Sequence, residues 1–165
     1  MKTRRRLLFQ TIFLAIFCLT ASAGAQTLTN KQVRKYRGEY LGIVSGIASN
    51  TIRNSAVAFE SRVNLTGKSR ELLSPQISSL YASPTHRIVY RRPTGDDRRV
   101  TITGYYVGTA INPGGFPEPV SGIRKMVITD RGRGGNVRFI MRFSDTLREG
   151  VNAAQDIKGT LRKGK

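Results

Sequence analysis

The chain is short of the residues that catalysis and metal binding use most often. Its one cysteine, Cys18, lies in an apolar N-terminal segment, His86 is its single histidine, and it has no tryptophan. Acidic residues are also scarce, because ten of them stand against 28 lysines and arginines, which gives a formal net charge of +18. One cysteine cannot form an internal disulfide, and a zinc site would lack its usual ligands. We therefore predict no metal and no cofactor.

The same shortage disfavours the common hydrolytic sites. A serine–histidine–carboxylate set would depend on His86, and the chain contains no G-x-S-x-G motif. A glycosidase needs two facing carboxylates, but Asp96 and Asp97 are adjacent in a turn flanked by arginines. Glu39 and Glu60 lie on predicted strands, and nothing in the sequence pairs them. The sequence predicts a protein that is not an enzyme, and an enzyme would require Glu39, Glu60 or His86 to converge in one cleft.

The N-terminal segment has the pattern of a bacterial secretory signal peptide. Lys2 and residues 4–6 form a basic start, residues 7–20 form an apolar run, and residues 21–23 offer a small-residue cleavage site. The run is shorter than the roughly 20 residues of a membrane-spanning helix, so a retained anchor is disfavoured. The paired arginines also resemble a twin-arginine signal, and both export routes stay open. We predict a periplasmic or extracellular protein with a single domain at residues 24–165.

Removal of residues 1–23 would leave a strongly basic domain. The predicted signal carries four basic residues and no acidic one, so the remainder has a net charge of +14. Such a charge attracts polyanions, including anionic envelope polysaccharides, lipopolysaccharide, anionic membranes and nucleic acid. The basic residues are spread along the chain, which is also typical of an ordinary soluble surface. Residues 131–135 superficially resemble an RGG segment, but export makes nucleic acid the least expected of these partners.

Alternating apolar and polar residues predict an all-β fold. A long strand at residues 98–111 and a second at residues 86–92, with a turn-rich segment between them, predict a hairpin. Further strands are predicted at residues 36–47, 50–63, 123–129, 136–144 and 156–162, with a long loop at residues 112–122 and a connection at residues 145–155. Thr29 and Gln32 predict a capping box on a short N-terminal helical turn. Ser74 and Pro75 predict the start of a second short helix that runs towards Tyr81.

This order of elements favours an antiparallel meander. About seven or eight strands joined mostly by hairpins are typical of an up-and-down barrel, and a two-sheet sandwich is the alternative. Glycines recur within the predicted strands at Gly38, Gly42, Gly104 and Gly108. Glycine inside a strand indicates a bend, a bulge or a close approach of two backbones, as a tight barrel requires.

Three features resemble the lipocalin and avidin group of small β-barrels. They are the short N-terminal helical turn, the sequence Gly38-Glu39-Tyr40 at the start of the first strand, and the basic residue Arg162 in the last strand. In lipocalins the aromatic residue is normally tryptophan, and a late arginine packs across it. Here Tyr40 and Arg162 would take these places. The resemblance implies a barrel with a ligand cavity, and it indicates no particular ligand.

Five residues are the candidate ligand-binding side chains. Tyr40 and Tyr106 occupy a repeated G-x-Y-aliphatic-G pattern, where a tyrosine either lines a pocket or packs over the backbone that the glycines expose. Arg138 and Arg142 alternate with phenylalanines on the face that we expect to be solvent or ligand, and Phe116 lies in the turn-rich loop.

The sequence as a whole predicts a non-enzymatic binding protein. Its ligand would be a small apolar molecule or an anionic component of the cell envelope. A structural or interaction protein of the envelope is the alternative, and it predicts a contiguous exposed apolar patch. The sequence leaves the oligomeric state open.

Overall fold

The computed structural model describes residues 28–50, 53–66, 74–77, 86–132, 138–150 and 153–164. The predicted signal peptide at residues 1–23 and the far part of the predicted second helix, residues 78–81, lie outside these ranges. Within the described residues, no helix combines the length and the hydropathy that a membrane crossing needs.

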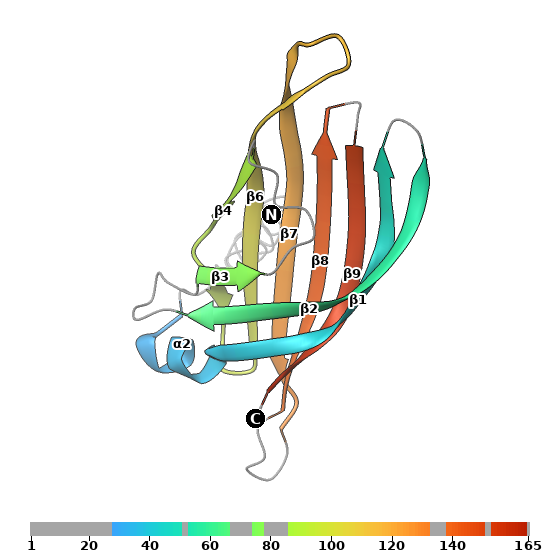
Figure 1. The fold of residues 1–165 in the computed structure, drawn as a ribbon. Coiled ribbons are helices and arrows are strands. Elements are labelled where there is room, and N and C mark those ends of the chain that lie inside the picture. Colours follow the sequence, from blue (N-terminus) through green and yellow to red (C-terminus); the bar gives the residue numbers. More distant parts are fainter. Residues whose placement is uncertain are drawn as a thin grey trace, which may run out of the picture.

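The described chain forms one antiparallel sheet and one short helix (Figure 1). The elements are helix α2 (Asn30–Tyr36) and strands β1 (Gly38–Asn50), β2 (Asn54–Thr66), β3 (Ser74–Ile77), β4 (His86–Tyr90), β5 (Thr94–Gly95), β6 (Arg99–Ile111), β7 (Pro117–Asp130), β8 (Phe139–Glu149) and β9 (Ala153–Lys163). The strand order is β3-β2-β1-β9-β8-β7-β6-β4, and the two-residue β5 also pairs with β6. The prediction of an all-β antiparallel meander with a short N-terminal helix is confirmed.

The sheet is not closed into a barrel. Its end strands are β3 and β4, whereas β1 and β9 are paired in its middle. The prediction of a closed barrel is therefore wrong among the described strands, and the two-sheet alternative is not observed either, because these strands share one sheet. Strands β1 and β2 nevertheless bend across the face of the long strands β6 to β9 (Figure 1), so the sheet rolls around a core.

The core fills the concave side of the rolled sheet. Inward-facing residues alternate with outward-facing ones along each long strand, as in β8, where Phe139 and Phe143 are buried and Arg142 is exposed. The main cluster draws on α2 and on both halves of the sheet: Leu28, Val33, Tyr36, Tyr40, Val44, Val63, Leu65, Val100, Ile102, Met126, Ile128, Phe139, Met141, Phe143, Ile157 and Leu161. A smaller cluster of Tyr106, Ala110, Val120 and Leu147 lies apart from it.

Helix α2 packs against this core at one end of the rolled sheet (Figure 1). The predicted capping box is present, since the backbone N–H of Gln32 donates to Thr29 Oγ1 (3.3 Å) and that of Thr29 donates to Gln32 Oε1 (2.7 Å). The hydroxyl of Tyr36 donates to the backbone oxygen of Asp96 (3.0 Å), which ties the helix to the turn before β6. Helix α2 ends at Tyr36. The first strand, predicted to begin at residue 36, therefore begins at Gly38.

Three predicted segments differ from the structure. Strand β7 begins at Pro117, so the loop before it spans only residues 112–116, and β8 runs through Asp145 to Glu149 instead of ending in a connection. Ser74 and Pro75 belong to strand β3 and not to a helix. Strand β3 pairs only with β2 at the edge of the sheet, where a residue without an N–H is tolerated, and this pairing overrides the local helical signal.

Glycines allow β1 and β9 to approach each other closely. A Cβ atom would lie 2.9 Å from Leu161 Cα if built at Gly42, and 2.7 Å from Ile157 Cα if built at Gly46. On the opposite strand, a Cβ atom at Gly159 would lie 2.8 Å from the Cα of Val44. Side chains do not tolerate such contacts with a backbone. The interpretation of the strand glycines as points of close backbone approach is confirmed on this pair of strands.

The substitution Gly46→Ala should lower the free energy of unfolding by about 1–3 kcal/mol, because the new methyl group must displace the backbone of β9. Urea unfolding followed by circular dichroism measures the change. The control is Ser45→Ala, at the neighbouring exposed position, which should change stability by less than about 0.5 kcal/mol. Equal stabilities of the two variants would contradict the close approach.

Candidate anion-binding surface

The five predicted binding residues lie in three separate places. Tyr40 and Tyr106 are buried on the concave face of the sheet. Arg138 and Arg142 are exposed on the outer face at β8, and Phe116 is exposed in the loop between β6 and β7. The structure therefore places the two arginines on one surface and does not bring all five residues together.

Tyr40 is a core residue. Its side chain is inaccessible to solvent, its hydroxyl donates to the backbone oxygen of Tyr36 (2.9 Å), and burial raises its pKa well above the usual range. Arg162, which the lipocalin resemblance placed across this ring, is exposed on the outer face. The inward-facing cation is the next residue, Lys163, whose Nζ lies 4.8 Å from the centre of the Phe139 ring. The residue-level correspondence is not observed at these positions.

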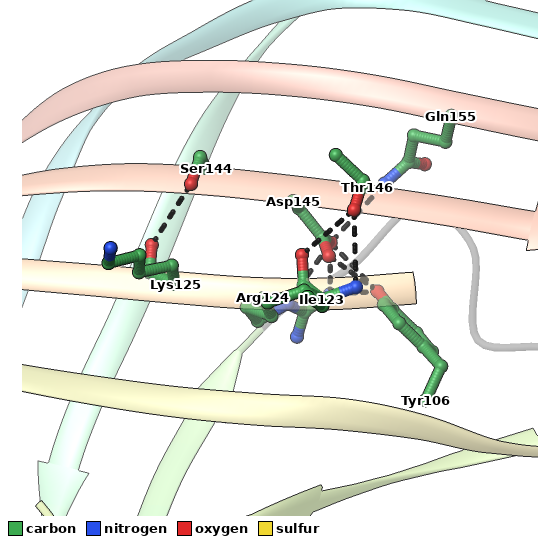
Figure 2. A network of polar contacts seen from close by, with 8 residues as sticks. All are labelled: Tyr106, Ile123, Arg124, Lys125, Ser144, Asp145, Thr146 and Gln155. Atoms are coloured by element: carbon green, nitrogen blue, oxygen red, sulfur yellow. Dashed lines mark hydrogen bonds and ion pairs between the residues drawn. The ribbon is translucent and has the colours of Figure 1, made fainter. Parts of the chain in front are cut away.

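Tyr106 belongs to a buried polar network with Arg124, Asp145 and Gln155 (Figure 2). Asp145 accepts hydrogen bonds from the Tyr106 hydroxyl (2.8 Å to Oδ2), from Arg124 Nε (3.0 Å) and Nη2 (2.6 Å), and from Gln155 Nε2 (3.3 Å). Arg124 Nη2 also donates to the Tyr106 hydroxyl (2.8 Å). The network joins side chains from β6, β7, β8 and β9 on the concave face.

Every charge in this network is compensated. Burial by itself would lower the pKa of Arg124, but the hydrogen bond and the negative charge of Asp145 outweigh it and raise that pKa. Burial also raises the pKa of Tyr106, so the hydroxyl keeps its proton and donates it to the carboxylate. A buried ion pair with its hydrogen bonds satisfied holds neighbouring strands in register, and its loss is costly. We assign this network a structural role.

The residues that an enzyme would need do not converge. Glu39 and Glu60 lie on the outer faces of β1 and β2. The side chain of His86 is 4% exposed on the concave face, and its ring contacts that of Tyr106 at 5.3 Å. Its Nδ1 lies 3.0 Å from Glu149 Oε1 without hydrogen-bond geometry. Glu39 and Glu60 are thus on the opposite face of the sheet from His86.

Sequence reasoning missed Arg124 and Asp145. The signal was present, because Asp145 continues the alternation of Phe143 and Leu147, and Arg124 continues that of Met126. Both residues therefore face the core, and a charged residue on a core-facing position requires a partner on the same face.

The exposed cations gather on the outer face of β6 to β9. In the register of the sheet, outward-facing residues on neighbouring strands form rows. The row Lys125–Ser144–Lys158 carries its lysines on the alternate strands β7 and β9. The row Arg99–Thr129–Ile140–Arg162 carries its arginines on β6 and β9, with two uncharged residues between them, and Arg142 lies in the row between these two. Because neighbouring strands are about 4.8 Å apart, Lys125 and Lys158 carry their charges at a spacing of roughly 10 Å.

Part of this face is hollowed into what we call the cationic groove. Its volume is about 370 Å³, and its lining is Arg99, Lys125, Val127, Thr129, Arg131, Ile140, Arg142, Phe143 and Ser144. Four of the nine residues are basic and none is acidic. Within the described part of the chain, no carboxylate forms an ion pair with any of the four. The carboxylate of Asp96 binds the backbone N–H of Arg99 (2.8 Å), and this pairing involves no guanidinium.

The strands beside the groove carry little negative charge on their outer face. Among the described residues that face outwards on β4, β6, β7 and β8, there is no aspartate or glutamate. On β9, the exposed Asp156 is paired with Arg148 (2.7 Å). An anion that approaches the groove therefore meets its four cations, and the one exposed acid described on β9 is already paired with Arg148.

Comparison with known proteins adds no assignment. No protein-family model matches the chain, and neither a curated protein nor a solved structure is detectably similar to it.

The substitution Asp145→Asn should lower the free energy of unfolding by about 3–5 kcal/mol, because it leaves the buried guanidinium of Arg124 without its counter-charge. The control is Asp156→Asn, which breaks an exposed ion pair and should cost less than about 1 kcal/mol. Chemical unfolding of the two variants measures both values. A small effect at Asp145 would show that the network is not needed for stability.

Proposed function

We propose that the protein, once exported, binds an anionic component of the cell envelope through the cationic groove and catalyses no reaction. The observation that carries this proposal is the group of four basic residues that, within the described part of the chain, form no ion pair and that lie in one hollow whose lining holds no acidic residue. Arginine and lysine beside hydroxyl groups such as those of Thr129 and Ser144 offer charge-assisted hydrogen bonds to phosphate, sulfate or carboxylate groups.

The lining of the groove favours this ligand class over the others that the sequence left open. Binding of single-stranded nucleic acid uses exposed aromatic rings on which bases stack, but the one aromatic residue at the groove, Phe143, is only 3% exposed. A small apolar ligand needs an apolar cavity, and the concave side of the sheet beside α2 is occupied by core side chains. An anionic polymer or glycolipid fits the outer face better than either.

The double variant Lys125→Gln/Arg142→Gln should bind dextran sulfate at least about tenfold more weakly than the unchanged protein, because each charge-assisted hydrogen bond contributes more than about 1 kcal/mol. Calorimetric titration at several salt concentrations measures the affinity. The logarithm of the binding constant should also fall less steeply with the logarithm of the salt concentration, by about 0.7 for each cation that no longer binds a sulfate group. Lipopolysaccharide serves as a second probe.

The matched control is Lys31→Gln/Arg34→Gln on helix α2, where both side chains are exposed. It removes the same net charge from a helix that packs on the core side of the sheet and contributes no residue to the groove, and it should leave the affinity close to that of the unchanged protein. Equal weakening by the two double variants would mean that only net charge acts, and the assignment of the groove would be wrong.

A second surface favours the alternative function, an interaction protein of the envelope. The outer face of β1 and β2 exposes Ile43 (69%) and Ile47 (56%), and Ala56 and Ala58 are also exposed there. A hollow of about 570 Å³ on this face is lined by Leu41, Gly42, Ile43, Ala58, Phe59 and Glu60. Contiguous exposed apolar surface of this kind is typical of protein contacts.

If the protein acts through this face by self-association, its sedimentation coefficient should rise with concentration, and Ile43→Asp should abolish the rise because a carboxylate cannot be buried unpaired. Analytical ultracentrifugation tests this, with Asn30→Asp, at an exposed position of helix α2 outside this face, as the control. A single species at every concentration would contradict self-association.

A further inference from the structure

The turn between β6 and β7 projects beyond the ends of the neighbouring strands (Figure 1). Asn112 holds its conformation, because its backbone N–H donates to the oxygen of Phe116 (2.9 Å) and its Oδ1 accepts from the N–H of Phe116 (2.9 Å). The backbone oxygen of Asn112 accepts from Gly115 (2.9 Å), and its Nδ2 donates to Glu118 Oε1 (3.0 Å). The turn is therefore a preformed element fixed by its own hydrogen bonds.

This turn presents apolar side chains to solvent. Phe116 is 69% exposed and Ile111 is 60% exposed, and residues 109–117 include no charged side chain. Large apolar groups held in water by a rigid turn offer binding energy without a cost in ordering. They mark this end of the molecule, opposite α2, as a contact surface (Figure 1).

The apolar surface continues down the outer face of the same strands. Val107 on β6 (36% exposed), Ile123 on β7 (45%) and Val89 on β4 (48%) lie below the turn, and Val89 and Ile123 both pair with Tyr105. Basic residues border this strip. Arg87 pairs with Val107, the guanidinium of Arg91 lies 4.6 Å from the centre of the Tyr105 ring, and the exposed Lys125 follows on β7 towards the cationic groove.

An apolar tip that continues into an outer face with cations, and with no outward-facing acid on the described parts of β4, β6, β7 and β8, matches one kind of partner. A bilayer with anionic lipids offers an apolar interior beneath a surface of uniform negative charge, and side chains such as Phe116 enter the boundary while Lys and Arg contact the headgroups. A protein partner would present mixed charges, and the outward-facing residues described on β4, β6, β7 and β8 contain no acid to match its cations.

We propose that the β6–β7 turn inserts Phe116 and Ile111 into the surface of an anionic lipid bilayer, with the basic residues beside the strip held at the headgroups. This proposal rests on the proposed function, because the basic residues beside the strip belong to the same outer face as the cationic groove. It adds the partner, which is a membrane surface, and the element that enters it.

The absence of tryptophan from the chain makes a direct test available. The tryptophan emission of Phe116→Trp should shift to shorter wavelengths when phosphatidylglycerol–phosphatidylcholine vesicles are added, and it should not shift with vesicles of phosphatidylcholine alone. Lipids brominated in their acyl chains should quench this emission. The control is Asn30→Trp, at an exposed position of helix α2 that belongs to neither proposed surface. Its emission should not change. Equal responses of the two variants, or no response of Phe116→Trp, would overturn the proposal.

Removal of the aromatic ring gives a second, independent measure. Phe116→Ala should partition onto the same vesicles about tenfold more weakly or worse, because the apolar area that enters the bilayer becomes smaller. Asn30→Ala on helix α2 should partition as the unchanged protein does. Circular dichroism should show both variants folded, since both side chains are exposed. Unchanged partitioning of Phe116→Ala would contradict insertion of the turn.

The groove variant Lys125→Gln/Arg142→Gln separates this inference from the proposed function. If it loses affinity for dextran sulfate while Phe116→Trp does not respond to vesicles, the membrane inference is wrong and the proposed function stands. If Phe116→Trp responds to anionic vesicles while the groove variant binds dextran sulfate unchanged, the proposed function is wrong and insertion of the turn stands.

Discussion

The pairing of β1 with β9 determines the shape of the molecule. The paired residues run from Tyr40 and Lys163 at one end to Asn50 and Ala153 at the other. Gly42, Gly46 and Gly159 allow the two backbones to approach closely. The pairing connects β1 to β3 with β4 to β9, which would otherwise be separate pieces of sheet. Because it joins them edge to edge, one sheet rolls far enough to enclose a core without closing.

The rolled sheet separates two chemical environments. Its concave side holds the apolar core, and the buried ion pair Arg124–Asp145 on that side is compensated by hydrogen bonds. Its convex side carries exposed cations that repel one another, which is unfavourable for the folded state by itself. The uncharged residues between the cations in each row reduce this repulsion, and an anion bound between the cations would remove part of it. In the proposed function, the ligand therefore binds outside the sheet and not within it.

Local sequence patterns predicted the elements better than their arrangement. The alternation around Phe139 predicted β8 and its buried face, and the pair Thr29–Gln32 predicted the helix cap, because both signals depend on neighbours in the chain. The open edge of the sheet and strand β3 were not predicted, since they depend on which strands pair. Arg142 was predicted as a binding residue, but its grouping with Lys125 required the register of β7 and β8. Asp145 was missed because its partner lies on another strand.

The position of β9 also affects how the chain folds. The hairpins β6–β7 and β7–β8 close over short turns and can form as soon as their residues are available, whereas β1 pairs with a strand from the far end of the described chain. Such non-local pairing raises the contact order and slows folding, because chain entropy is lost before the contacts form. Until β9 docks, β1 and β8 both present long unpaired edges, which are templates for aggregation. The last strand therefore limits how long the chain is exposed to misassembly.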